Sequence, residues 1–457
     1  MLRIIGSLAA AMLVSTAGAA KHDHAGNAIK DNTHASPQFD VSALLTAARG
    51  APPAICSLAS RAVDDGNWRR GGDAPVTPLG PSRDREWSIG TRALPAADIA
   101  RLMDGLASED QCVREISVRL IGTQDDSAVT PQLVKRLASN DASVRAVAAF
   151  GLGLVHAKTA VSQLIHSLRD ASSGAAANSA WALGRIDDGR ARGPLVSALG
   201  DTSSLAREAA VVALGRLDSV SSATAIVRTL QHDDVASVRR AAAWALGKLD
   251  AKDGALALAT ALTNDSDAKV REMSAWALGE LDETSGSTAL QRALQKDSDE
   301  DVRESAAWAL GHTGDESATD VLAAAAESDQ SVSVRGTAAW ALGHAGRSDN
   351  RAVAALSHLL RDSNDDTRLR AAWALGQLGD STALAAIDSA LGREQNPEIR
   401  RALIRAISKS GGNTAARMRV LIDSKDPQVR EAAVRSLAGG RAFGPWPWPW
   451  PRPRPWP

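Results

Sequence analysis

The sequence contains no Tyr and only 3 Phe, so its 12 Trp supply most of the large aromatic side chains among 457 residues. It has only 2 Cys, which excludes a disulfide-dense scaffold. It also lacks an excess of either charge: the net charge is -1, so no overall positive field draws the chain to nucleic acid or anionic lipid. Hydrophobic residues make up 44% and charged residues 23%, which is typical of a globular chain with a buried core.

Long apolar runs are missing beyond the first residues of the chain. Residues 1–20 combine Arg3, an apolar stretch through Val14 and the small residues Ala17 to Ala19, which is the pattern of a cleaved secretory signal peptide. The stretch is shorter than the roughly 20 apolar residues that a membrane span needs. We therefore expect a periplasmic or secreted protein.

The two cysteines, Cys56 and Cys112, both lie in the first quarter of the chain. Export into an oxidising compartment predicts that they form a disulfide. The alternative is a pair of buried thiols in separate helices, because Cys packs as a small hydrophobic residue.

The tetrapeptide WALG recurs at a nearly constant interval. With the related VALG included, its first residue occupies positions 181, 212, 244, 276, 308, 340 and 373, at steps of 31 to 33. Weaker copies around Arg119, Phe150, Arg405 and Arg435 extend the register to eleven units between about residues 95 and 440. A period of this length is typical of repeat architectures.

Each unit has the same order of signals: an acidic residue or Asn, then Val-Arg, then an Ala-rich helix ending in Leu-Gly. Asn396-Pro397 and Asp426-Pro427 predict N-caps followed by a proline in the first turn, and the Gly after Leu predicts the end of the helix. A second amphipathic helix, such as residues 318–327, follows after a turn. Because neither helix can bury its apolar face alone, the units must stack into an all-α solenoid.

The repeated motif, D/N-x-x-[VI]-R followed by A-x-W-A-L-G, resembles the short HEAT repeats first noted in phycobilisome lyases. The resemblance extends over about three quarters of the chain. It implies a right-handed superhelix of about eleven helical hairpins, with the second helices on the concave face and a protein partner bound there.

An Arg stands five residues before the Trp position in every unit except one, which has Ala176. A row of Arg can bind phosphates, but the resemblance implies that each Arg bonds an acidic residue and loop carbonyls between neighbouring repeats, which the near-zero net charge favours. Ala176, with Gly174 interrupting the helix beside it, then predicts the softest interface. The series consists of Arg114, Arg145, Arg207, Arg239, Arg271, Arg303, Arg335, Arg368, Arg400 and Arg430.

On a helical wheel, Trp308 lies away from the core face formed by Val302 and Ala306. This placement favours packing across the second helix of a neighbouring unit. The alternative is an aromatic stripe whose exposed indole edges bind a partner, since Trp can pack on one face and expose the other. The candidate residues are Trp244, Trp276, Trp308, Trp340 and Trp373.

Catalytic and metal-binding signatures are not found. His312 and His344 occupy equivalent positions in adjacent repeats, but no third ligand recurs with them, so we expect no metal site. The sequence has no His-Glu dipeptide, which argues against a di-iron hydroxylase, and no H-E-x-x-H. The signal peptide argues against a cytoplasmic bilin lyase. We therefore expect neither catalysis nor a cofactor.

Non-repetitive segments flank the array. We expect a signal peptide over 1–20, a flexible leader over 21–38, a helical cap with a long loop over 39–95, the solenoid over 96–440 and a Trp/Pro-rich tail over 441–457. Alternating Pro predicts a polyproline II conformation for the tail. Exposed Trp side chains there call for cover by a partner protein or a membrane interface, and an inert end is the third alternative. The tail displays Trp446, Trp448, Trp450 and Trp456.

These observations predict an exported, non-catalytic scaffold that binds a protein partner on its concave face, with the tail as a second candidate contact. The identity of the partner does not follow from the sequence, and nucleic acid is not expected. Two alternatives stay open: a HEAT-type enzyme, resembling a bilin lyase or a di-iron hydroxylase, and an envelope or membrane-surface protein that is targeted by its tail.

Overall fold

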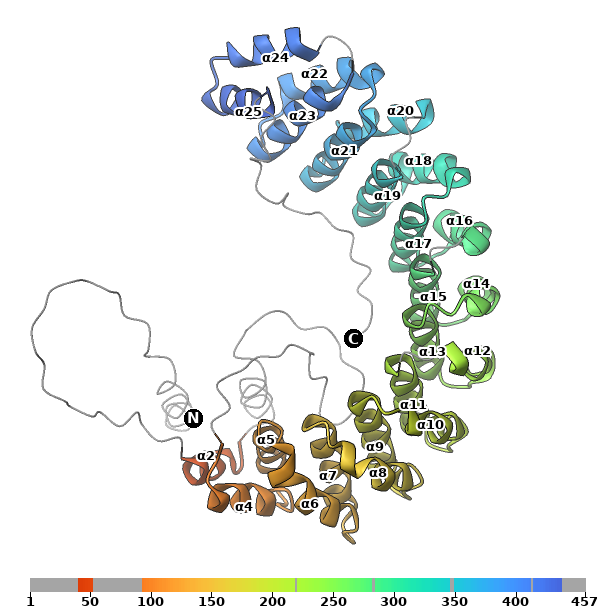
Figure 1. Ribbon diagram of the computed structural model, residues 1–457. Helices are drawn as coiled ribbons and strands as arrows, with labels where there is room; N and C mark the ends of the chain where they lie inside the picture. The colour runs from red at the N-terminus through yellow and green to blue at the C-terminus, as the bar shows by residue number, and fades with distance from the viewer. Residues whose placement is uncertain are drawn as a thin grey trace, which may run out of the picture. The chain divides into compact units, whose positions relative to one another are not determined.

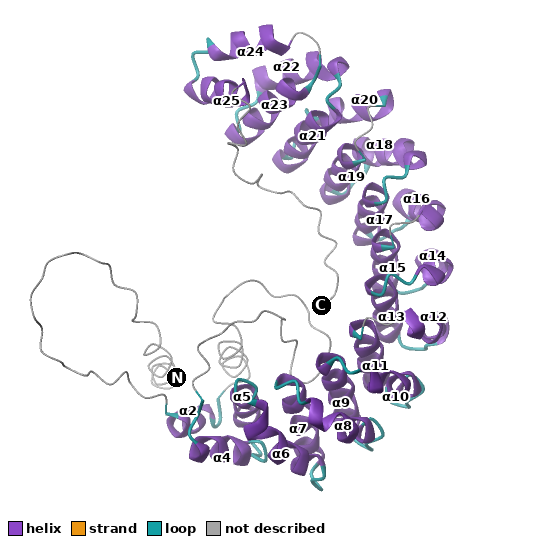
Figure 2. Ribbon diagram, viewed as in Figure 1, coloured by secondary structure: helices purple, strands orange, loops and turns teal. Residues whose placement is uncertain are grey.

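All secondary structure in the described part of the chain is helical, which confirms the all-α class (Figure 2). None of the described helices is long and apolar enough to cross a membrane. The predictions for the signal peptide, the leader, Cys56, the long loop and the four tail Trp concern residues outside this part, and they stay predictions. The structure, a computed structural model, describes residues 40–51, 93–217, 220–281, 284–345, 349–411 and 414–437.

The chain divides into two units, of which the first ends at Leu217 and the second begins at Asp218. The helices of the first unit are α2 (Val41–Ala48), α4 (Ala96–Gly105), α5 (Gln111–Ile121), α6 (Asp126–Leu137), α7 (Ala142–Leu154), η1 (Lys158–Ala160), α8 (Val161–Ser167), α9 (Ser173–Ile186), η2 (Gly189–Ala191), α10 (Arg192–Ala198) and α11 (Ser204–Arg216).

The second unit continues the same alternation of helices (Figure 1). Its helices are α12 (Ala223–His232), α13 (Ala236–Lys248), α14 (Ala255–Asn264), α15 (Ala268–Glu280), α16 (Ser287–Lys296), α17 (Glu300–His312), α18 (Thr319–Ser328), α19 (Val332–His344), α20 (Asn350–Leu359), α21 (Asp365–Leu378), α22 (Leu384–Arg393), α23 (Pro397–Lys409), α24 (Thr414–Ile422) and α25 (Pro427–Leu437). One-turn 3-10 helices precede several of them: η3 (Val220–Ser222), η4 (Lys252–Gly254), η5 (Thr284–Gly286), η6 (Glu316–Ala318) and η7 (Ser381–Ala383).

Every position of the WALG register lies in a helix of its own, which confirms the eleven repeats. The register occupies α5, α7, α9 and α11 in the first unit and the odd-numbered helices from α13 to α25 in the second. Within each unit, a helix of this set packs on the next helix of the set and on the helix that precedes it in the chain. Each unit is therefore an all-α solenoid.

The predicted helix starts are confirmed where the sequence places a cap. The side chain of Asn396 accepts hydrogen bonds from the backbone N–H groups of Glu398 and Ile399, and Pro397 is the first residue of α23. The Asp426 side chain does the same for Gln428 and Val429 at the start of α25. These side chains satisfy N–H groups that have no partner within the helix.

The Gly of WALG does not end its helix, contrary to the expectation. Gly311 is buried inside α17, which continues to His312. A Cβ atom added at Gly311 would lie 2.5 Å from the Cβ and 2.6 Å from the Cα of Ala341 in α19. The residue is Gly because the backbone of the next WALG helix approaches it too closely for a side chain. Gly247, Gly279 and Gly343 meet Ala277, Ala309 and Ala374 in the same way.

In the second unit, the WALG helices α13 to α23 form the inner row of an arc, and the even-numbered helices α12 to α22 form its outer row (Figure 1). The Gly–Ala contacts allow consecutive WALG helices to lie close together. The stack of repeats therefore curves toward the side of the WALG helices. The expectation that the second helices line the concave side is therefore wrong for this unit. We call α13, α15, α17, α19, α21 and α23 the inner row and the even-numbered helices the outer row.

Candidate functional site

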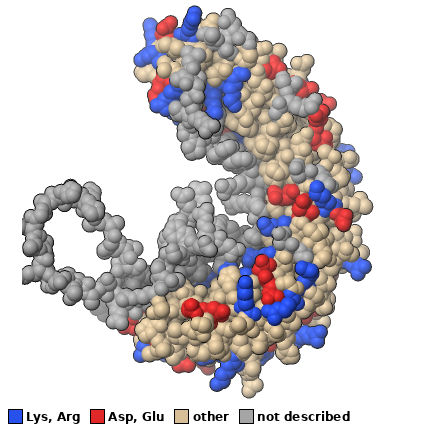
Figure 3. Space-filling view, in the orientation of Figure 1, with Lys and Arg blue, Asp and Glu red and all other residues tan. Residues whose placement is uncertain are grey.

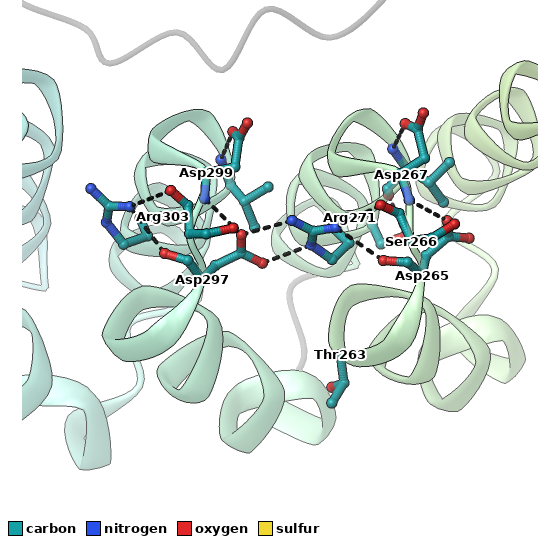
Figure 4. A network of polar contacts seen from close by, with 12 residues as sticks. Thr263, Asp265, Ser266, Asp267, Arg271, Asp297, Asp299 and Arg303 are labelled. Carbon is teal, nitrogen blue, oxygen red and sulfur yellow. Dashed lines mark hydrogen bonds and ion pairs between the residues drawn. The ribbon is translucent and has the colours of Figure 1, made fainter.

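The repeated Arg builds a ladder of ion pairs between consecutive repeats. Arg271 donates hydrogen bonds from Nε and Nη2 to the two carboxylate oxygens of Asp297, at 2.7 and 2.9 Å (Figure 4). Its Nη1 donates to the backbone carbonyl of Asp265 at 3.0 Å. Asp297 also accepts a hydrogen bond from the backbone N–H of Asp299. Each Arg thus fastens the loop before its own helix to the loop of the following repeat.

The same arrangement recurs along both units and confirms that these Arg residues join neighbouring repeats. Seven of the ten guanidinium groups are paired with a carboxylate, which argues against the row as a binding site for phosphate groups. The pairs are Arg145–Asp170, Arg239–Asp265, Arg271–Asp297, Arg303–Asp329, Arg335–Asp362, Arg368–Glu394 and Arg400–Asp426. Arg114, Arg207 and Arg430 donate to the loop carbonyls of Ser108, Asp201 and Ser424.

Burial and hydrogen bonding act in opposite directions on the ladder carboxylates. Burial raises the pKa of Asp297, but hydrogen bonds from Arg271 and from the backbone of Asp299 outweigh it and hold the pKa below its usual value. The hydrogen bond to Asp297 in turn raises the pKa of Arg271. The Arg271 and Asp297 side chains are only 14% and 9% exposed, so the ladder is a buried structural device.

The ladder is interrupted where Ala176 replaces Arg. By the spacing of the Arg145–Asp170 pair, the missing Arg would reach Asp201, whose carboxylate accepts a hydrogen bond from the backbone N–H of Ser203, as Asp297 does from Asp299. The side chain of Asn178 supplies a different link, donating to the Ala146 carbonyl at 2.8 Å. Gly174 does not interrupt the helix as expected, because α9 begins at Ser173 and is continuous through it.

We expect the start of α9 to open first within the first unit, since a rung of the ladder is missing there and solenoid stability depends on nearest-neighbour contacts. Native-state hydrogen exchange should show faster exchange for amides of residues 175–178 than for the equivalent turn of α7, where Arg145 is paired with Asp170. Equal protection of the two turns would contradict this expectation.

The Trp column of the inner row is packed between repeats. Trp244, Trp276, Trp308 and Trp340 are 3–8% exposed, whereas Trp373 is half-buried. These exposures confirm the packing role and show that four of the five candidate residues do not form an exposed aromatic stripe.

The preceding WALG helix is a contact partner of the indole that was not expected. The Cζ3 atom of Trp308 lies 2.7 Å from where a Cβ of Gly279 would stand, so the indole rests on the preceding WALG helix. The helical wheel of a single unit contains no information about the adjacent unit, and for this reason it missed the contact.

Aromatic and cationic side chains continue the column in the first unit. The rings of Phe150 and Trp181 stack with centroids 4.5 Å apart. The guanidinium of Arg119 lies over Phe150, and that of Arg185 lies over Trp181. Burial, followed by repulsion from Arg185, lowers the pKa of Arg119 to about 10. The sequence register placed Arg119 and Phe150 in the column but did not reveal this stacking.

One exposed position per repeat varies along the inner row. It lies four residues after the Trp position and is exposed in six consecutive repeats; it follows the buried Gly in α13 to α21 and Ser408 in α23. We call it the variable position. The residues there are Lys248, Glu280, His312, His344, Gln377 and Lys409.

Two histidines at the variable position form a stack with the Trp column. The ring of His312 lies parallel to that of His344, with centroids 6.4 Å apart, and each ring also stacks on the Trp four residues before it. Burial, and then repulsion from His312, lowers the pKa of His344. Within the described ranges, no group of three or more His, Cys, Asp or Glu side chains is placed to hold a metal ion.

Charges of both signs are mixed over the visible surface (Figure 3). On the inner row, Lys269 of α15 pairs with Glu272 in its own helix and with Asp301 in α17. Further along, Glu304 accepts a hydrogen bond from the hydroxyl of Thr337 in α19. Burial raises the pKa of both Glu272 and Glu304. These side chains bond with one another across repeats.

The predicted disulfide has one described member. Cys112 lies in α5 and is 4% exposed, and the described part of the chain contains no free cysteine. Its expected partner, Cys56, lies outside the described residues, so the pairing of these two residues stays a prediction.

Family comparisons match more than half of the chain. Residues 161–247, 255–343 and 319–408 match the family described as HEAT repeats, and residues 238–264 match the PBS lyase HEAT-like repeat. No curated protein matches the chain at a significant level.

Several solved structures are similar to the chain. The Kap95:Nup1 complex is 14% identical with a TM-score of 0.52, covering 75% of this chain and 56% of that chain. An engineered protein is 20% identical with a TM-score of 0.43, covering 76% and 98%. The complex of CpcE and CpcF of phycocyanin lyase from Nostoc sp. PCC7120 is 24% identical with a TM-score of 0.32, covering 50% and 92%. At these identities the likeness concerns the fold alone.

Proposed function

Since the chain belongs to the HEAT repeat family, we propose that it is a non-catalytic scaffold that binds a protein partner along the inner row of its second unit, outside the cytoplasm. The variable position carries this proposal. The Trp and Gly that pack repeats together recur in five consecutive repeats of the inner row, whereas the exposed residue beside them is of four different types along the row: Lys, Glu, His and Gln. Exposed side chains that are evenly spaced but differ in chemistry are suited to binding an extended segment of a protein partner.

The surroundings of the inner-row side chains support binding rather than catalysis. The carboxylates of Glu272 and Glu304 are hydrogen-bonded to neighbouring side chains, and the two His rings lie against Trp. The sequence of residues 1–20 supports the proposed location, because it has the pattern of a secretory signal peptide.

Site-specific photo-crosslinking tests the proposal. A photoreactive amino acid is placed at Lys248 or Glu280 on the inner row, and at Leu256 or Asp320 on the outer row, where both residues are exposed. In cells that export the protein, we expect one crosslinked partner at the inner positions and none at the outer ones. The crosslink should form again with that partner in purified form.

Crosslinks that are equally strong on both rows, or restricted to the outer row, would contradict the proposal. The same crosslinking in a chain without residues 445–457 separates the contribution of the tail from that of the inner row. We expect the inner-row crosslinks to persist in the shortened chain, since the inner row supplies its own surface.

A further inference from the structure

The interface between α21 and α23 differs from the inner-row interfaces before it. The Trp position of α23 is Arg405, so this repeat has no indole to cover the glycine of the preceding helix. A Cβ at Gly343 would meet Cζ3 of Trp373 at 3.1 Å, as in the earlier interfaces. At Gly376 the nearest atoms all belong to the backbone and Cβ of Ala406, at 3.2 Å or more.

The missing indole leaves a shallow recess on the inner row. It is lined by Gly376 and alanines of α21 and α23, and by the side chains of Trp373, Arg405, Gln377 and Lys409. Trp373 is half-buried here, whereas the four preceding Trp are buried. The recess encloses no space of the size of a water molecule, so a ligand would lie across it and not inside it.

The polar lining of the recess has one sign of charge. It contains the two cations Arg405 and Lys409 and no carboxylate. The Lys409 ammonium donates a hydrogen bond to the neutral amide oxygen of Gln377, at 2.6 Å. Burial lowers the pKa of Arg405, and burial followed by repulsion from Arg405 lowers that of Lys409. Blue side chains are visible over α23 in Figure 3.

We propose that the recess bounded by Trp373, Arg405 and Lys409 binds an acidic peptide segment of the partner protein. A carboxylate of the segment lies between the guanidinium and the ammonium, and an adjoining apolar side chain rests on the indole. The proposal rests on the proposed function, because it assigns the chemistry of one contact on the same inner row. The shallow shape favours a peptide over a small anion. The mixed charges of the other variable positions favour it over nucleic acid, which needs a row of cations.

The test uses the full chain and a fluorescein-labelled peptide in which Glu alternates with Leu, with binding measured by fluorescence anisotropy. The matched peptide carries Gln in place of Glu. We expect the Glu peptide to bind at least about tenfold more tightly than the Gln peptide, as the loss of a charge-assisted pair predicts. Inorganic phosphate at equal ionic strength should compete no better than chloride.

Arg405→Trp is the decisive variant, because it restores the residue that fills this place in the preceding repeats. We expect it to weaken binding of the Glu peptide about tenfold or more, like Lys409→Gln, while the unfolding midpoint stays unchanged or rises. Arg393→Gln, at the exposed end of α22 in the outer row, is the matched control and should change the affinity less than about twofold.

Three results would overturn the proposal: equal affinity for the two peptides, wild-type affinity in Arg405→Trp, or an equal loss in Arg393→Gln. Competition by phosphate in preference to the peptide would assign the recess to a free anion, and would also overturn it. None of these results would change the expected crosslinks at Lys248 and Glu280 on the inner row. A failure of the acidic-peptide proposal can therefore be distinguished from a failure of the proposed scaffold function.

Discussion

Replacing Arg271 with Ala is expected to lower the free energy of unfolding of the array by about 3 kcal/mol, at the lower end of the range for breaking a buried ion pair. The loss is large because the Asp297 carboxylate is only 9% exposed. Without the Arg271 guanidinium, which donates a hydrogen bond to each of its two oxygens, this carboxylate remains buried and unpaired with a cation. The carbonyl of Asp265 also loses a hydrogen bond. Urea unfolding followed by circular dichroism measures the change in midpoint and slope.

Two further variants separate the ladder from ordinary charge effects. Arg271→Lys keeps the charge but lacks the planar fork, so it should recover only part of the stability. Arg190→Ala breaks an equally short pair with Asp188, but the Arg190 side chain is 60% exposed and its partner lies two residues away in the same turn. We expect Arg190→Ala to change the stability much less than Arg271→Ala, because surface ion pairs contribute little. If Arg190→Ala and Arg271→Ala lower the free energy of unfolding by similar amounts, the ladder pairs stabilise the protein no more than a surface ion pair does.

The ladder also makes stability depend on acid in a defined direction. The folded-state pKa values of Asp170, Asp265, Asp297 and Asp362 lie below the usual 3.8. Their contribution is therefore complete above the unfolded pKa and is lost as the pH falls through the lowered folded values. The stability difference between wild type and Arg271→Ala should shrink as the pH is lowered below 3.8. A difference that grows on acidification would contradict the assignment.

Replacing Gly311 with Ala should destabilise the array by about 2–3 kcal/mol, as overpacking does in well-packed cores. The new methyl group would stand 2.6 Å from the Cα of Ala341, and a backbone atom cannot move away as a flexible side chain can. This outcome reverses the ordinary effect of the substitution, because Ala is a better helix former than Gly by about 1 kcal/mol. Thermal and urea unfolding of the full chain measure the change.

Gly392→Ala provides the matched control within the same unit. Gly392 lies in α22, and a Cβ there would meet no atom within 4 Å. We expect this variant to be as stable as wild type or more stable, by up to about 1 kcal/mol. A stabilised Gly311→Ala would mean that adjacent WALG helices are farther apart than the structure places them.

The sequence was most informative where a residue acts within its own repeat or in the same way in every repeat. The helices, the caps at Asn396 and Asp426 and the pairing of the Arg series all follow from local pattern and period. Two features could not be predicted, because they depend on the distance between repeats. One is Gly311, which has the sequence context of a helix end but is a contact between helices. The other is the recess at Arg405, which exists only because its neighbour lacks an indole.

The ladder has a consequence for how such a chain can change in length. In the ladder, the Arg of one repeat binds an acidic residue of the next repeat, so no repeat pairs with itself. For example, Arg271 binds Asp297, and Arg303 binds Asp329. An in-frame deletion or duplication of one 32-residue period, such as residues 272–303, leaves every guanidinium with a carboxylate at its usual spacing. Copy number can then vary by recombination between repeats without creating an unpaired buried charge, and the variable positions are the part of the surface that is gained or lost.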